Sequence, residues 1–162
     1  MAAVGGVAAL VRTGGYAIDP ATSAKLAALA PWQYVVVRAV ARRVVAPDRA
    51  EAPLADDVGI VEFVDGYLVD VRAAERRDFV AFVRFLEHVA PLASGFWRRF
   101  SELSSFDQDA VLASLESSSS DTLRAGFQAL RALVLMGYYR DPRTFGILGY
   151  RGPLLSPGEG AP

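Results

Sequence analysis

The sequence predicts an all-α fold: an irregular bundle of five or six helices with an extended C-terminal tail rich in aromatic residues and glycine. In several segments the apolar residues recur three or four positions apart, which is the spacing of one helix face. Proline and glycine residues separate these segments and are typical of helix boundaries. No stretch shows the even alternation of a half-buried strand, so the pattern favours helices packed on helices.

Composition excludes several classes of protein. A chain of 162 residues, 52% of them hydrophobic, suits one domain with a packed core. The net charge of −1 argues against a nucleic-acid-binding protein, because attraction to phosphates needs a basic surface. The absence of cysteine excludes disulfides, thiolate zinc sites and iron–sulfur ligation by thiolates. No run approaches the ~20 apolar residues of a transmembrane helix.

The predicted organisation is one domain between two terminal segments. We expect residues 1–20 to be a flexible N-terminal segment, residues 21–153 to be a single helical domain, and residues 154–162 to be a frayed tail. The apolar start, Met1–Val11, lacks a positively charged n-region and is a poor signal peptide as written. The sequence as written therefore predicts a cytoplasmic protein. It predicts a periplasmic one if a partner carries the export signal or the true start lies upstream.

Three helices are expected in the first half of the chain. A short one is expected over Ala21–Leu29, and Pro31 suits the first position of a longer helix that Pro47 stops. The apolar stripe of that longer helix is Trp32, Val35, Val36, Ala39, Val40 and Val44. The third helix should carry Asp56 and Asp57 near its positively charged end. Its apolar positions are Val58, Val61, Val64 or Asp65, and Leu68.

The clearest helical pattern covers Glu75–Ala90. Its apolar face is Phe79, Phe82, Val83, Leu86, Val89 and Ala90, while Arg84, Glu87 and His88 share another side. His88 is the only histidine, so a catalytic triad or a histidine zinc site would lack partners. We expect it to be a surface or half-buried side chain.

The next segments are shorter. A short helix is expected over Phe96–Leu103, with Trp97 and Phe100 facing inward. Ser105 and Gln108 fit the N-cap and N3 positions of a capping box that opens the following helix. The apolar stripe of this helix is Val111, Leu112 and Leu115, and the serines at 117–120 form a hinge after it. The residues expected to form the core are Phe79, Phe82, Leu86, Leu112, Leu130 and Val134.

The most apolar helical run leads into the C-terminal tail. Its apolar face is Leu123, Phe127, Leu130, Val134 and Gly137. The helix should stop near Tyr139 or Arg140, because Pro142 donates no N–H and disfavours helical geometry at Asp141. Aromatic residues and three glycines follow. A segment this aromatic is expected either to pack on its own domain or to cover the surface of another protein.

No motif for catalysis, cofactor binding or metal ligation stands out. The tail glycines Gly146, Gly149 and Gly152 follow no strand, which a phosphate-binding loop needs. Asp56 and Asp57 are better explained as a helix start than as an acid–base pair. We therefore expect no catalytic, cofactor-binding or metal-binding residue in this chain, and interpret it as a partner protein rather than an enzyme.

Four blocks between Leu29 and Pro153 share their order and spacing with a known family. The blocks are Leu29-Ala30-Pro31 through to Pro47-Asp48; Asp56-Asp57-Val58-Gly59 with Phe63 and Asp65; Phe100, Leu103 and Phe106-Asp107 leading into Leu112–Glu116; and Leu133–Pro142 followed by Gly149-Tyr150-Arg151-Gly152-Pro153. With these blocks the chain resembles the gluconate 2-dehydrogenase subunit 3 family, the small subunits of flavin-dependent sugar and sugar-acid dehydrogenases.

The resemblance implies a non-catalytic subunit bound to a large FAD-carrying subunit of the glucose–methanol–choline (GMC) oxidoreductase type. In such complexes the large subunit oxidises a sugar or related alcohol, and electrons pass to a cytochrome subunit or another acceptor. The small subunit is implied to aid folding, stability or export of its partner, with FAD in the partner and no cofactor of its own. The alternative is a free-standing helical binding or scaffold domain that holds an apolar ligand between its helices.

The C-terminal segment, Tyr138–Pro153, is the predicted partner-binding site. Tyrosine rings and arginines are the side chains enriched at binding hot spots. The predicted partner-binding residues are Tyr138, Tyr139, Arg140, Asp141, Pro142, Phe145, Tyr150, Arg151 and Pro153. The alternative that this segment wraps its own bundle stays open.

Overall fold

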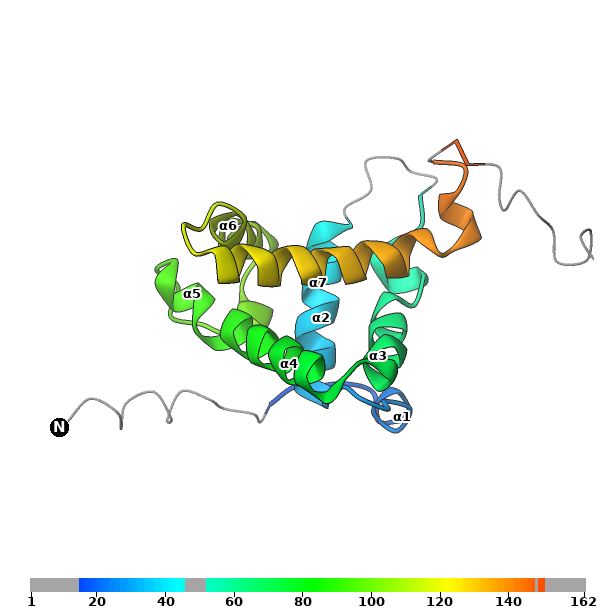
Figure 1. The fold of residues 1–162 in the computed structure, drawn as a ribbon, viewed down its shortest axis with the longest axis horizontal. Helices are drawn as coiled ribbons and strands as arrows, with labels where there is room; N and C mark the ends of the chain where they lie inside the picture. Colours follow the sequence, from blue (N-terminus) through cyan, green and yellow to red (C-terminus); the bar gives the residue numbers. More distant parts are fainter. Residues whose placement is uncertain (1–14, 46–51, 148, 151–162) are drawn as a thin grey trace, which may run out of the picture.

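The computed structural model describes residues 15–45, 52–147 and 149–150, and these residues form helices, turns and loops without a strand (Figure 1). The helices are α1 (Pro20–Ser23), α2 (Pro31–Val44), α3 (Ile60–Asp70), α4 (Ala73–His88), α5 (Ala90–Ala93), α6 (Ser105–Glu116) and α7 (Asp121–Tyr139), with 3-10 turns η2 (Ala55–Asp57), η3 (Phe100–Glu102) and η4 (Pro142–Thr144). The predicted all-α class is confirmed. The tail at residues 154–162 lies outside the described residues.

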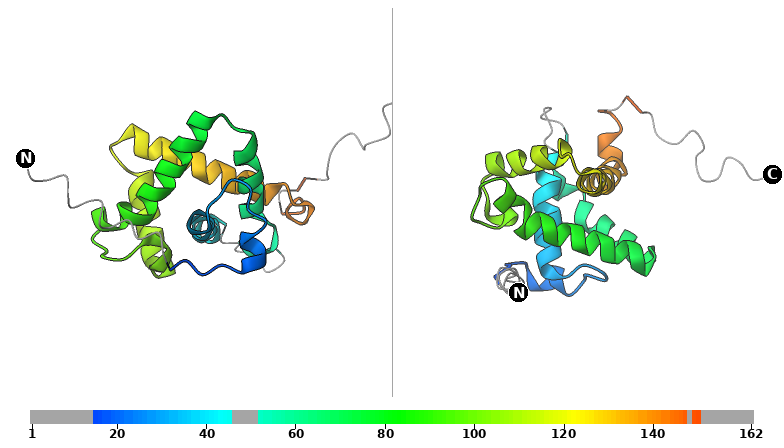
Figure 2. Two further views of the ribbon diagram at one scale, coloured as in Figure 1. Left: turned by 90° about the horizontal axis from the view of Figure 1, so that it is seen from below. Right: turned by 60° about the vertical axis from the view of Figure 1, so that its left-hand side comes forward.

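Helix α2 is the centre of the bundle, seen end-on in the left view of Figure 2. It packs on α3, α4, α6 and α7, so Val36, Val37 and Val40 are fully buried. Its buried surface is broader than the predicted stripe. Gln33, Tyr34 and Ala41 are also buried, while Val35, Ala39 and Val44 are only half-buried. A helix that is surrounded by neighbours buries more than the one face that periodicity identifies.

Helix α1 is shorter than predicted, because a side chain from another helix takes over its backbone donors. Asp19 caps α1 by accepting from the Thr22 N–H at 3.0 Å, and the helix ends after Ser23. The buried carboxylate of Asp65 on α3 then accepts the three consecutive N–H groups of residues 27–29, at 2.8, 2.9 and 2.7 Å. These donors serve a tertiary contact, so a helix over Ala21–Leu29 does not form.

The side of α4 that carries Glu87 and His88 is buried, so the expectation that His88 is a surface or half-buried side chain is wrong. The Glu87 side chain is fully buried, and His88 beside it is also buried. The Glu87 carboxylate accepts hydrogen bonds from the Tyr16 hydroxyl at 2.8 Å, the Ser101 N–H at 3.0 Å and the Ser101 hydroxyl at 2.6 Å. Burial raises the pKa of Glu87, against the opposing effect of these hydrogen bonds. Burial and the nearby carboxylate raise the pKa of Tyr16 to about 12.

The two carboxylates hold one stretch of chain against the bundle. This stretch, residues 15–30, is called the N-terminal strap, and it runs along the lower end of α2 (Figure 1, blue). Glu87 binds the strap at Tyr16, and Asp65 binds it near its end at Leu29. The strap therefore has a defined path although it contains only one turn of helix.

The predicted core is confirmed for four of its residues. Leu86, Leu112, Leu130 and Val134 are buried, whereas Phe79 and Phe82 on α4 are half-buried. Helix α4 ends at His88, and Val89, which was predicted to face inward, is 42% exposed at the junction with α5. The helical pattern therefore runs across a bend that moves Val89 off the apolar face.

The segment before α6 also differs from prediction. Phe100 is fully buried as predicted, but only the three-residue turn η3 forms there, and Trp97 is 91% exposed. The N-cap of α6 is Ser104, whose hydroxyl accepts from the Asp107 N–H at 3.2 Å. The predicted cap was one residue too late. Gln108 is buried instead, where its amide donates to the Phe100 carbonyl at 3.0 Å.

Helix α7 ends at Tyr139, as the position of Pro142 predicted.

Glycine lets α7 approach two other helices closely. A Cβ at Gly137 would lie 3.1 Å from the Phe63 ring and 3.2 Å from Ile60 on α3. A Cβ at Gly126 would clash with the Phe82 ring on α4. The position of α7 over α3 and α4 thus depends on glycine, which has no Cβ, at positions 126 and 137.

We expect the variant Asp65→Asn to lower the free energy of unfolding by about 2–3 kcal/mol, because its amide group would face backbone donors that now meet a charged acceptor. Urea unfolding followed by circular dichroism measures this change. Asp70→Asn, exposed at the end of the same helix, is the matched control. Equal stability of the two variants would contradict a structural role for the Asp65 carboxylate.

Glu87 should make stability dependent on pH. Because burial raises its pKa, the folded chain keeps a proton that the unfolded chain has released. The stability from this difference is complete below the ordinary pKa of about 4.3, and it is lost as the pH rises through the folded-state pKa. Relative to Glu87→Gln, the wild type should therefore lose stability as the pH rises from the ordinary pKa of about 4.3 through the raised folded-state pKa. Urea midpoints across this range test it, and parallel curves would refute it.

Candidate functional site

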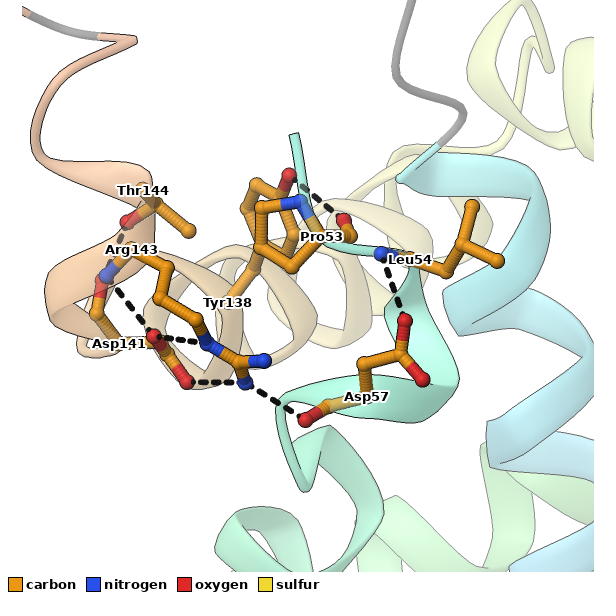
Figure 3. A network of polar contacts seen from close by, with 7 residues as sticks. All are labelled: Pro53, Leu54, Asp57, Tyr138, Asp141, Arg143 and Thr144. Atoms are coloured by element: carbon orange, nitrogen blue, oxygen red, sulfur yellow. Dashed lines mark hydrogen bonds and ion pairs between the residues drawn. The ribbon is translucent and has the colours of Figure 1, made fainter. Parts of the chain in front are cut away.

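The C-terminal segment folds against the turn that precedes α3 (Figure 3). After α7 ends, the chain forms η4 beside residues 53–57, more than eighty residues earlier in the sequence. Pro142 stops the helix, and the Asp141 carboxylate caps the turn by accepting from the Arg143 N–H at 2.9 Å. Asp141 and Pro142 thus create the bend that turns the segment toward residues 53–57.

Tyr138 anchors the segment to its own bundle. Its side chain is 5% exposed, and its hydroxyl donates to the Pro53 carbonyl at 3.0 Å. Burial raises the pKa of Tyr138 above the ordinary value for tyrosine. Its ring also packs edge-on against Tyr139, with centroids 5.2 Å apart. Tyr138, a predicted partner-binding residue, is therefore buried against its own chain.

Arg143 forms the second anchor, and it was not among the predicted site residues. Its guanidinium donates to Asp141 through Nε at 2.9 Å and through Nη2 at 2.8 Å, and Nη2 also reaches the Asp57 carbonyl at 2.7 Å. The Arg143 guanidinium lowers the pKa of Asp141 to about 2. The sequence signal is the Asp-Pro-Arg order, in which an arginine follows a capping aspartate by two positions.

Thr144 completes the turn. It is fully buried, and its hydroxyl donates to the Asp141 carbonyl at 2.7 Å. This bond stays within the C-terminal segment, whereas Tyr138 and Arg143 fix η4 against the turn before α3, as Figure 3 shows. For these residues the alternative that the segment packs on its own bundle holds.

Other predicted site residues remain available on the surface. Tyr139 is 39% exposed, Tyr150 is 47% exposed, and Pro142 is exposed. Phe145 is half-buried and packs edge-on against Tyr150, with ring centroids 5.1 Å apart. The Tyr150 N–H also donates to the Phe145 carbonyl at 2.9 Å, which closes the turn between them.

Arg140 points to a different part of the molecule. It is exposed, and its guanidinium lies 5.3 Å from the centroid of the Phe63 ring on α3. The structure therefore brings together Tyr138 with Tyr139, Asp141 with Arg143, and Phe145 with Tyr150, while Arg140 joins α3. Arg151 and Pro153, also predicted to bind a partner, lie outside the described residues.

Within residues 15–45, 52–147 and 149–150, no group of three or more histidine, cysteine or acidic side chains is arranged to hold a metal ion. His88 is buried, and that burial lowers its pKa. In the same part of the chain, no helix combines the length and apolarity that crossing a membrane requires.

Comparison with known families gives one match. Residues 31–151 match the family model described as Gluconate 2-dehydrogenase subunit 3, which extends from the first residue of α2 through the C-terminal turn. Comparisons with curated proteins and with solved structures gave no match. Because the family model covers most of the chain, the protein belongs to the gluconate 2-dehydrogenase subunit 3 family, as the four sequence blocks predicted.

Proposed function

We propose that this chain is the non-catalytic small subunit of a dehydrogenase complex, and that it binds and stabilises a large FAD-dependent subunit of the GMC type. The family match over residues 31–151 carries this proposal, because the family is named for a subunit of gluconate 2-dehydrogenase. The large subunit holds FAD and oxidises a sugar or related alcohol, and this chain holds no cofactor. A cytochrome subunit of the same complex is a suitable electron acceptor.

The C-terminal segment is the part that we assign to the interface. Its exposed rings, Tyr139 and Tyr150, offer large apolar area with a polar end, and both are attached to a turn held by Tyr138 and Arg143. Aromatic residues on a fixed backbone lose little conformational freedom when a partner binds, so more of the contact energy becomes affinity. In this proposal, the anchored residues fix the backbone of the segment, and the exposed residues contact the partner.

We expect the double variant Tyr139→Ala/Tyr150→Ala to weaken binding of a co-expressed large subunit at least tenfold, or by about 1.4 kcal/mol. Its melting temperature should stay close to that of the wild type, since both rings are partly exposed. Biolayer interferometry on the purified chains measures the affinity.

Phe106→Ala is the matched control, because Phe106 is 80% exposed and lies on α6. This variant should bind like the wild type. Full affinity of the double variant would remove the C-terminal segment from the interface. Failure of the wild-type chain to bind any large dehydrogenase subunit would contradict the proposed function itself.

The isolated chain should show no flavin, haem or metal and should reduce no dye with a sugar as substrate. Co-expression with the large subunit should give a yellow complex with a flavin spectrum and dye-reducing activity. Absorption spectra and dye assays on the two preparations make the comparison. A flavin spectrum together with activity in the single purified chain would overturn the assignment of catalysis to the partner.

A further inference from the structure

A cavity of about 300 Å³ opens between the last turn of α3, the first half of α4 and the middle of α7. Helices α3 and α4 meet at a corner, because only two residues separate them, and α7 packs on both (Figure 1). We call this cavity the corner groove. Its volume lies at the lower limit of the roughly 300–1,000 Å³ clefts that hold small ligands, which favours the side chains of a docked segment over a whole cofactor.

The walls of the corner groove are apolar and incompletely covered. Phe79 and Phe82 of α4 and Leu133 of α7 line it, and both phenylalanines are only half-buried. The groove exists because α7 carries small residues at this point. Phe82 lies over Gly126, and Ala129 leaves space that a larger side chain would fill. Exposed apolar walls of this kind are typical of a surface that another molecule covers.

The rim of the corner groove is acidic. Glu75 and Asp78 of α4 line it; Glu75 pairs with Arg72, and Asp78 forms no ion pair with any described residue. The arginines of α4 lie on a different surface, where Arg76, Arg77 and Arg84 surround a separate depression. Charge is thus segregated across α4, and the groove side complements a basic side chain rather than an acidic one.

A row of side chains connects the corner groove to the end of α7. Tyr67 lines the groove and its ring centroid lies 6.3 Å from that of Phe63. The Arg140 guanidinium lies 5.3 Å from the same Phe63 ring, and Arg140 directly follows Tyr139 of the proposed interface. One partner can therefore cover the groove and the C-terminal segment together.

We propose that the corner groove receives an apolar segment of the large subunit that carries a lysine or arginine beside its apolar residues. The apolar side chains pack between Phe79, Phe82 and Leu133, and the basic group faces Glu75 and Asp78. This inference rests on the proposed function, because it takes the large dehydrogenase subunit as the partner. It adds a second contact surface and specifies the chemistry that this surface recognises.

The test is to fill the groove without touching the core. Ala129 is exposed and lines the groove, so Ala129→Phe places a ring in the space meant for the partner. Ala132→Phe is the matched control, since Ala132 is exposed on the same helix and does not line the groove. With the full-length chain and the purified large subunit, Ala129→Phe should weaken binding at least tenfold, while Ala132→Phe binds like the wild type.

A charge variant tests the basic group separately. Asp78→Lys should also weaken binding, with a loss that is larger at low salt than at high salt, because like charges then meet across the interface. Circular dichroism melts check that both groove variants remain folded. If one of them does not fold, the other still decides the outcome, since the two changes lie on different helices.

Several results would overturn the inference. Wild-type affinity of Ala129→Phe and Asp78→Lys, with lost affinity of the Tyr139/Tyr150 double variant, would reject the groove and leave the proposed function intact. No binding by the wild-type chain would reject both. Self-association that Ala129→Phe abolishes would make a second copy the occupant. A small apolar molecule retained by the wild type and absent from Ala129→Phe in native mass spectra would make the groove a ligand site.

Discussion

The buried carboxylate of Asp65 fixes the arrangement on which the rest of the bundle depends. It accepts three consecutive backbone N–H groups from residues 27–29, just before α2 begins. The next N–H, that of Ala30, donates to the Gln33 side chain at 2.7 Å, so the four consecutive N–H groups of residues 27–30 that lead into α2 all have acceptors. Helix α2 is the element that the other long helices surround. The position of this central helix relative to α3 is therefore set by a polar contact and completed by apolar packing.

Buried charge is tolerated here because each carboxylate meets several donors. An ionised carboxylate loses its hydration on burial, a cost that protein hydrogen bonds must offset. Glu87 receives three such bonds from Tyr16 and Ser101, and they join the N-terminal strap and the η3 region to α4. The raised pKa of Glu87 shows that burial still outweighs these bonds. Loops that would contribute little apolar area are thereby held in defined positions.

At the proposed interface, some residues hold the C-terminal segment on the bundle and others remain exposed for a partner. Tyr138 and Arg143 bind the C-terminal segment to the turn before α3, Thr144 closes η4 internally, and Tyr139 and Tyr150 stay exposed. Gly137 brings α7 close to Phe63, which in turn lies under Arg140 and beside Tyr67. The contacts that position α7 thus also connect the end of that helix to the corner groove, so one scaffold carries both of the surfaces that we propose for partner binding.

The sequence by itself determined the helical class, the start of α2, the C-terminal end of α7 and the family. Apolar spacing and proline act over a few residues, and both can be read from a single chain. Only the tertiary structure decided that α1 stops at Ser23, that Glu87 and Tyr138 are buried, and that Trp97 is exposed. The deciding contacts join residues far apart: 36 positions for Leu29 with Asp65, 71 for Tyr16 with Glu87 and 85 for Tyr138 with Pro53. Local periodicity gives the face of a helix on which a residue lies, but which distant group meets that face is settled by packing in three dimensions.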